Sequence, residues 1–199
     1  MKVLLINGSP HEKGCTYTAL SLIAGELNNA GVDTEILHVG GKPVGGCIGC
    51  GGCRSGEGCV FGGVVNEAIE KAKTADGFVF GSPVHYASAS GNMTSFMDRL
   101  AYAGGQYLAY KPAAICCSAR RAGTTTTLDQ LVKYPQFFHM PLVNGSYWAM
   151  VHGSNPEQVL QDAEGCAVMQ ELGRNMAWLL RCIEAGKAAG IDHPQNPPR

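Results

Sequence analysis

The sequence is poor in charge and has no long hydrophobic run. Charged residues make up 16% of its 199 positions, the formal net charge is -1, and the basic residues are scattered rather than grouped. Because a nucleic-acid partner needs a basic patch, we expect none. The apolar start of the chain ends at Ile6, too early for a signal peptide, and no later run reaches the roughly 20 residues of a membrane-spanning helix. We therefore expect a cytoplasmic protein without membrane association, whose partners are small molecules.

Cysteine, by contrast, is abundant. The chain has nine cysteines, and an odd number without an export signal indicates metal ligands or small buried hydrophobes rather than a disulfide framework. Four of them, Cys47, Cys50, Cys53 and Cys59, fall in one short glycine-rich loop. Two-residue gaps bring successive sulfurs around a common point, and glycines let backbone amides turn toward anionic sulfur. The pattern therefore favours a [4Fe-4S] cluster on these four cysteines.

Two alternatives to the cluster stay open. One is a loop of reduced thiols at a contact between subunits. The other is zinc, which fits less well because structural zinc sites usually combine two separated pairs of ligands, whereas these cysteines lie in one compact loop. An iron count on anaerobically purified protein separates the cluster from both alternatives.

Strands and helices alternate along the chain. Short β-branched apolar runs are each followed by a longer helical segment after a glycine or serine loop, which predicts a parallel sheet. The expected strands are residues 2–6, 34–39, 77–80 and 113–117, with a fifth that begins at 140–143. The expected helices are residues 16–29, 64–73, 90–103, 125–134 (stopped near Pro135) and 157–185, followed by an irregular tail from Gly186.

These elements predict an α/β fold, namely a flavodoxin-like doubly wound five-stranded parallel sheet in the order 2-1-3-4-5 with helices on both faces. The length suits one hydrophobic core, so residues 1–199 are expected to form a single domain with a Cys/Gly-rich loop insertion at 40–63. In such a sheet the ligand binds at the carboxyl ends of the strands, where the strand order reverses. Three loops should therefore converge there.

Each of the three loops suits a different part of a flavin nucleotide. The first, residues 7–18, presents hydroxyls and amides at a helix N-terminus, which suits a phosphate. It lacks both the triphosphate-binding lysine and the three-glycine dinucleotide fingerprint, so a monophosphate such as that of FMN fits better. The second, residues 81–91, offers Tyr86 beside small residues to a planar ring. The third, residues 118–125, offers amides, arginine and hydroxyls to the electron-rich pyrimidine edge of a flavin.

Several motifs carry a resemblance to a known family. In chain order they are Gly8-Ser9-Pro10 with Gly14-Cys15-Thr16, the cysteine run, Pro83-Val84-His85-Tyr86, Asp98-Arg99 and Arg120-Arg121-Ala122-Gly123-Thr124. Over nearly its whole length the chain resembles the flavodoxin-like NAD(P)H-dependent FMN reductases, and its cysteine run resembles the branch called iron-sulfur flavoproteins. The resemblance implies FMN as the cofactor and NAD(P)H as the electron donor.

The resemblance also implies which residues bind FMN. Those around the phosphate are Ser9, Cys15, Thr16 and Thr18. Those around the ring system come from the second and third loops and are Pro83, Val84, His85, Tyr86, Ser118, Arg120, Arg121 and Gly123. Relatives often have asparagine or serine at the position of Cys15, arginine at that of His11, and acidic residues after the last cysteine, where this chain is apolar.

The remaining polar and aromatic residues are given simpler roles. We expect Cys116 and Cys117, on a predicted strand, and Cys166 and Cys182, on the closing helix, to act as small hydrophobes. Asp98 and Arg99 are expected to form an ion pair at a helix end or a subunit contact. The loop residues Tyr147 and Trp148 are the aromatics expected to reach a neighbouring subunit's flavin. No side chain is expected to act as a catalytic acid or base, because FMN carries the chemistry.

Three functions are consistent with these observations. The first is an FMN-dependent oxidoreductase that passes electrons from NAD(P)H to a small acceptor such as a flavin or a quinone. The second is an iron-sulfur flavoprotein electron carrier, with a cluster on the four loop cysteines and a ferredoxin-like donor. The third is a non-catalytic flavin- or metal-binding module. For the redox functions we expect a homodimer or homotetramer in which subunits share the active site.

Overall fold

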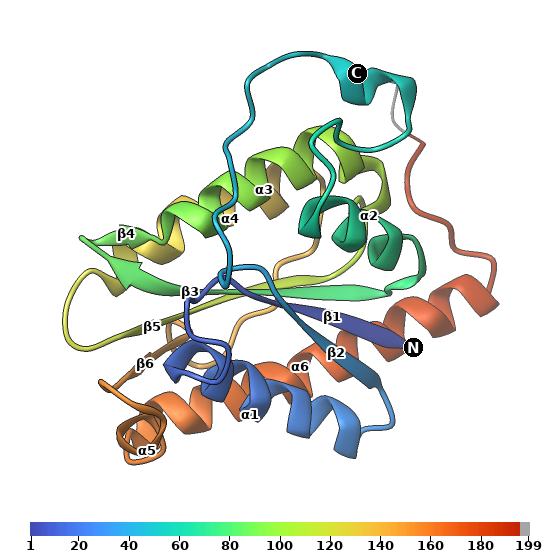
Figure 1. Cartoon of the computed structure of the whole chain (residues 1–199). Helices are drawn as coiled ribbons and strands as arrows, with labels where there is room; N and C mark the ends of the chain where they lie inside the picture. The colour runs from blue at the N-terminus through green and yellow to red at the C-terminus, as the bar shows by residue number, and fades with distance from the viewer. Residues whose placement is uncertain (196–199) are drawn as a thin grey trace.

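A twisted parallel sheet lies between two layers of helices in the computed structural model, which describes residues 1–195 (Figure 1). The strands are β1 (Lys2–Asn7), β2 (Asp33–His38), β3 (Gly77–His85), β4 (Ser88–Ala89), β5 (Ala113–Ala119) and β6 (Met150–His152). The parallel strands follow the order β2-β1-β3-β5-β6, and β4 pairs antiparallel with the end of β3. This order confirms the predicted flavodoxin-like fold, in which the direction of winding reverses beside β1.

Helices cover both faces of the sheet. They are α1 (Cys15–Asn29), α2 (Val64–Thr74), α3 (Gly91–Gly104), α4 (Thr124–Phe137), α5 (Pro156–Val159) and α6 (Ala163–Ala188), with 3-10 turns η1 (Gly52–Ser55) and η2 (Gly105–Tyr107). Figure 1 shows α1 and α6 on one face and α2, α3 and α4 on the other. Within residues 1–195, none of the helices combines the length and the apolar character that crossing a membrane requires.

Alternating side chains of the central strands supply the two halves of the core. Val3 and Leu5 of β1 join the cluster that contains the inner residues of α1 and α6, whereas Leu4 and Ile6 join the cluster beneath α2, α3 and α4. The alternation arises because successive side chains of a strand point to opposite faces. A strand covered on both faces must be apolar throughout, which explains the continuous hydrophobic run of β1.

The predicted fifth strand at residues 140–143 is wrong. That segment makes only one isolated bridge, between Ala113 and Leu142, and the strand that completes the sheet is β6, which pairs with the end of β5. The turn-forming residues 144–146 lead the chain away from the sheet after Val143. The chain returns to the edge at Ala149, whose carbonyl accepts a hydrogen bond from the Cys117 amide at 3.0 Å.

Two predicted helix boundaries are also wrong. The closing helix is split, because Asp162 ends the turn after α5 and caps α6 by accepting a hydrogen bond from the Gly165 amide at 3.0 Å. Helix α4 continues past Tyr134 through Pro135, which lies in its last turn, where a lost amide donor disturbs few bonds. Helix α6 extends to Ala188, residues 191–195 are irregular as expected, and the last four residues of the predicted tail lie outside the described residues.

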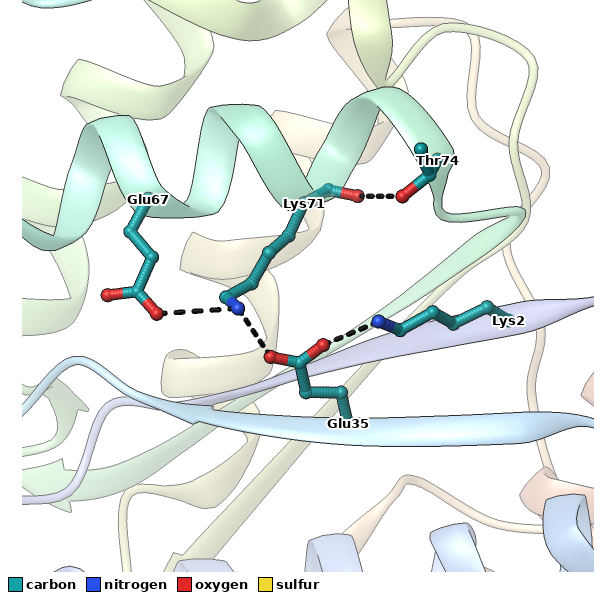
Figure 2. A network of polar contacts seen from close by, with 5 residues as sticks. All are labelled: Lys2, Glu35, Glu67, Lys71 and Thr74. Atoms are coloured by element: carbon teal, nitrogen blue, oxygen red, sulfur yellow. Dashed lines mark hydrogen bonds and ion pairs between the residues drawn. The ribbon is translucent and has the colours of Figure 1, made fainter.

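A polar network fastens α2 to the sheet (Figure 2). Glu35 of β2 lies 2.6 Å from Lys2 Nζ of β1 and 2.6 Å from Lys71 Nζ of α2. Lys71 also lies 3.5 Å from Glu67 on its own helix, and its carbonyl accepts from the Thr74 hydroxyl at 3.3 Å. Hydrogen bonds from Lys2 and then Lys71 lower the pKa of the Glu35 carboxyl.

Glu35→Gln is expected to lower the free energy of unfolding at pH 7 by about 0.5–1 kcal/mol, because partly exposed ion pairs contribute about 0.2–1 kcal/mol each. The pKa of Glu35 in the folded state lies below its unfolded value of about 4.3. The stabilisation is therefore present above pH ~4.3 and lost as the pH falls through the folded pKa. Urea unfolding of parent and variant at pH 7 and pH 3 measures this difference.

The matched control is Glu70→Gln, which removes a single pair with Lys73 on the same helix. Its cost should be smaller than that of Glu35→Gln. A cost of Glu35→Gln that is equal at pH 7 and pH 3 would contradict the electrostatic explanation.

Candidate functional site

The β1–α1 loop is shaped by a side chain that sequence analysis missed. Asn7, fully buried at the end of β1, donates from Nδ2 to the Glu12 carbonyl at 2.9 Å and accepts at Oδ1 from the Ser9 amide at 3.1 Å. The predicted site residue Ser9 is also buried, and its hydroxyl accepts from the His11 amide at 3.1 Å. A polar residue at the last position of a buried strand was the available signal for Asn7. Together these bonds hold the loop in a curved conformation ahead of α1.

The N-terminus of α1 leaves its first amides to a ligand. Gly14 is the N-cap, so no side-chain oxygen bonds to these amides, and the first turn contains no acidic residue. Unpaired amides together with the helix dipole attract an anion. The end of α1 therefore fits the monophosphate of FMN.

Side chains predicted to surround the phosphate are engaged with protein atoms. The Thr18 hydroxyl donates to the Gly14 carbonyl at 3.2 Å, and the Cys15 thiol donates to the Gly153 carbonyl at 3.5 Å. Burial raises the pKa of Cys15, which keeps this thiol neutral. Of the predicted phosphate contacts, the side chains of Cys15 and Thr18 bond to backbone carbonyls and so hold the loop instead.

Hydrogen bonds tie the three predicted loops together at the carboxyl edge of the sheet. The Gly8 amide donates to the Gly81 carbonyl at 2.9 Å, and the Ser90 hydroxyl donates to the Gly8 carbonyl at 2.8 Å. The buried hydroxyls of Thr16 and Ser118 lie 2.8 Å apart, which joins the first loop to the end of β5. The structure thus joins Thr16, in the first turn of α1, to Ser118 of β5, which lies 102 residues later in the sequence.

The second loop is a strained hairpin between β3 and β4. Pro83 and Val84 are half-buried, His85 is exposed, and Tyr86 is fully exposed. Tyr86 and Ala87 have φ angles of 50° and 58°, a left-handed conformation that costs an L-residue about 1 kcal/mol or more. The backbone therefore holds the Tyr86 ring out into solvent, at the edge where a planar ring is expected.

The third loop packs against this hairpin through a glycine. Gly123 has a φ of 91°, and a Cβ there would lie 2.6 Å from Cα of Ala87. Only glycine permits both the conformation and the close approach. Arg120 and Arg121 of the same loop are exposed. This edge therefore combines positive charge with the aromatic ring of Tyr86.

All four loop cysteines line one cavity of about 330 Å³, here called the cysteine cavity, which is also lined by Arg99, Tyr102 and Phe61. Cys47 and Cys50 are exposed, whereas Cys53 and Cys59 are half-buried. The four cysteines lie on the segment that leaves the sheet after β2, which Figure 1 shows above α3, and Arg99, Tyr102 and Ala103 of α3 also line the cavity.

Two asparagines hold the cysteine segment to neighbouring helices. Asn66 of α2 accepts from the Cys59 amide at 2.8 Å and donates to the Cys59 carbonyl at 3.0 Å. Asn92 of α3 donates to the carbonyls of Gly40 and Lys42 at 3.0 Å and accepts from the Val44 amide at 3.1 Å. The insertion is thus fixed on both sides of its cysteines.

The donor set of the cavity fits an iron-sulfur group. As the side chains lie, no three His, Cys, Asp or Glu residues among positions 1–195 are close enough to hold a single metal ion. In a [4Fe-4S] cluster each of four thiolates binds a separate iron atom, so the sulfurs surround a cage rather than one ion. Four cysteines line this one cavity, which is the number of thiolates that such a cluster requires.

The predicted ion pair between Asp98 and Arg99 is wrong. Asp98 accepts a hydrogen bond from the Tyr134 hydroxyl at 2.6 Å, and burial together with this bond raises the pKa of Tyr134. Arg99 is buried and donates from Nε to Cys59 Sγ at 3.2 Å. Its spacing from the buried Phe96, three residues earlier, placed it on the inner face of α3 and was the signal for this role.

The cysteines outside the cavity fit their predicted role with one exception. Cys116 and Cys117 are buried in β5, where burial raises both pKa values, that of Cys117 to about 12. Cys166 is half-buried, but Cys182 is exposed, so its prediction as a small core residue is wrong. It lies on the outer face of α6, which faces away from the sheet.

Tyr147 and Trp148 are exposed and pack edge to face, with ring centroids 4.9 Å apart. They line a second cavity, of about 490 Å³, beside α4. Their contact with the flavin of a neighbouring subunit stays a prediction.

Comparison with known proteins identifies a family and supports the fold. The family model described as NADPH-dependent FMN reductase matches residues 1–155. An iron-sulfur flavoprotein of Methanocaldococcus jannaschii is 28% identical over 92% of this chain and 100% of its own. Among solved structures, RosB with bound 8-demethyl-8-formylriboflavin-5'-phosphate superimposes with a TM-score of 0.75 at 13% identity, over 100% of this chain and 90% of its own. A flavodoxin from the domain Archaea superimposes with a TM-score of 0.62 at 14% identity, over 91% and 99%.

The two structural matches support the fold, and the family model covers all three loops of the carboxyl edge as well as the cysteine segment. With the strand order and the loop geometry described above, this match shows that the chain belongs to the NADPH-dependent FMN reductase family.

Proposed function

We propose that the chain is an FMN-dependent oxidoreductase that passes electrons from NAD(P)H to a small acceptor such as a flavin or a quinone. The observation that carries this proposal is the convergence of three loops on one edge of the sheet, beside the uncapped N-terminus of α1. When bound, FMN supplies the hydride and electron chemistry. The chain supplies binding and orientation.

Each loop contributes a distinct part of that binding. The first amides of α1 would hold the phosphate, in a loop kept in shape by Asn7. Tyr86 would lie against the ring system, and the cations Arg120 and Arg121 would favour negative charge on its pyrimidine edge. Since negative charge accumulates there on reduction, these arginines favour the reduced cofactor.

A second candidate function is an iron-sulfur flavoprotein electron carrier with a [4Fe-4S] cluster on Cys47, Cys50, Cys53 and Cys59. Two observations favour it: all four cysteines line one cavity, and a relative that covers most of the chain carries the name iron-sulfur flavoprotein. Such a carrier would receive electrons from a ferredoxin-like donor. Nine free cysteines suit a reducing, cytoplasmic setting, and the exposed aromatics at the carboxyl edge suit a homodimer or homotetramer.

Anaerobically purified protein tests both functions. The proposed reductase should take up about one FMN per chain, because the N-terminus of α1 offers a site for one phosphate. NADH or NADPH should then bleach the absorption of the bound flavin. The carrier should add a broad absorption and about four iron atoms per chain. Failure of both nicotinamides to bleach the flavin would contradict the reductase. A colourless chain that binds no added FMN would contradict both and leave the non-catalytic module.

A further inference from the structure

Arg99 is a buried cation without a carboxylate partner among residues 1–195. Its side chain is 7% exposed, and no other Asp, Glu, Lys or Arg among residues 1–195 is buried to this degree. None of the ion pairs formed within residues 1–195 includes Arg99, and the adjacent Asp98 is bonded to Tyr134. Burial of a charge is strongly unfavourable unless an opposite charge or several hydrogen bonds offset it. The surroundings of Arg99 should therefore contain its compensating group.

The guanidinium of Arg99 bonds to both ends of the cysteine segment. Nη1 lies 3.4 Å from the carbonyl of Gly45, which precedes the first cysteine, and Nη2 lies 2.9 Å from that of Gly62, which follows the last. The ring of Phe61 lies 5.6 Å from Cζ, in a cation-π arrangement. The planar guanidinium thus bonds to both ends of residues 45–62 and holds this segment against α3.

The third donor of Arg99 points at sulfur. Nε lies 3.2 Å from Cys59 Sγ, and Arg99 lines the cysteine cavity together with all four thiols. Four thiolates outweigh the positive charge of an iron-sulfide core, so an assembled cluster is an anion, and it becomes more negative on reduction. An anion in the cavity would supply the opposite charge that Arg99 does not find among residues 1–195.

We propose that Arg99 is the positioning residue of the cysteine cavity. It closes residues 45–62 over α3, and it sets a fixed positive charge against Cys59 that favours an anionic iron-sulfur centre and its reduced state. This inference rests on the second candidate function. The closing role concerns the protein alone, whereas the charge role requires iron.

Three variants separate the effect of the guanidinium hydrogen bonds from that of the positive charge and from that of a side chain that only lines the cavity. Arg99→Met keeps the length but removes both the guanidinium and the charge, and Arg99→Lys keeps the charge without the guanidinium. The matched control is Arg54→Met, because Arg54 also lines the cysteine cavity but is exposed. Uptake of FMN by each variant verifies that it is folded.

The first measurement uses the full chain without iron. Hydrogen exchange of the amides in residues 45–62 should be roughly tenfold faster or more in Arg99→Met than in the parent, because charged hydrogen bonds at both ends are lost. Arg99→Lys should be intermediate, and Arg54→Met should match the parent. Exchange that is equal in Arg99→Met and the parent would overturn the closing role, whether or not the chain binds iron.

The second measurement follows anaerobic reconstitution with ferrous iron and sulfide. Arg99→Met should retain several-fold less iron per chain than the parent, whereas Arg99→Lys and Arg54→Met should retain most of it. In a redox titration followed by electron paramagnetic resonance, the cluster that remains in Arg99→Met should be reduced at a lower potential than that in Arg99→Lys. Equal potentials would overturn the charge role, and a parent that binds no iron would overturn the cluster function and the charge role with it.

Discussion

Cys50→Ala should lower the iron retained after anaerobic reconstitution at least about tenfold, since loss of a direct ligand costs more than loss of a supporting residue. Cys50 lines the cysteine cavity and is exposed, so its removal leaves the hydrophobic core intact. FMN uptake should be unchanged, because the flavin site is built from the β1–α1, β3–β4 and β5–α4 loops. Iron and sulfide per chain, measured after desalting, test this expectation.

Cys182→Ala is the matched control. Cys182 is also an exposed cysteine, but it lies on α6, which Figure 1 shows on the opposite face of the sheet from α3 and the segment of the four cysteines. Its removal should leave the iron content at the parental value. If Cys50→Ala retained as much iron as Cys182→Ala, the cavity would not be the site of the cluster.

Gly40→Ala should weaken FMN binding about 100-fold, which corresponds to the loss of roughly two charge-assisted hydrogen bonds. A Cβ at residue 40 would lie 2.1 Å from the carbonyl oxygen of Ser9 and 2.4 Å from its carbonyl carbon. These are backbone atoms of the loop that precedes α1, so the loop must shift away from the conformation that Asn7 stabilises. Titration of FMN fluorescence against parent and variant measures the change.

Riboflavin and a second glycine serve as controls for this variant. Riboflavin lacks the phosphate, so its affinity should change much less than that of FMN, and the variant should lose most of the preference for FMN. Gly45→Ala adds a methyl group with no atom within 4 Å and should bind FMN as the parent does. Equal losses for FMN and riboflavin would show that the phosphate loop is not the part affected.

The cysteine cavity shows how far local spacing predicts a site. The four cysteines lie within one short segment, so their meeting at one cavity followed from chain connectivity and from the glycines between them. Arg99 could not be assigned in the same way. Its partners Gly45 and Cys59 belong to a segment that α2, β3 and β4 separate from α3 in the sequence, and only packing of the insertion over α3 brings them together.

The edge of the sheet likewise has features that local sequence predicts and others that depend on packing. The β5–β6 pairing lies where the chain returns after residues 144–146, and the sequence of Met140 to Val143 is as apolar as that of a strand. Local propensity did not distinguish the two segments, because both lie beside β5: residues 140–143 meet its start in one bridge, and β6 pairs with its end. The break between α5 and α6 likewise depends on the capping bond of Asp162.

By itself, the sequence determined the alternation of strands and helices, the order of the sheet, the three loops at its carboxyl edge and the four thiols of one segment. These follow from periodicity, from chain connectivity and from the handedness of parallel crossovers, which act over short stretches of chain. Only the tertiary structure decided that Asn7 shapes the phosphate loop, that Gly40 must lack a side chain beside Ser9, and that Arg99 faces Cys59. The approach of Gly40 to Ser9 and of Arg99 to Cys59 joins atoms far apart in the sequence and arises only when the whole core packs, whereas the bonds of Asn7 are local and depend on the turn that the loop takes after β1.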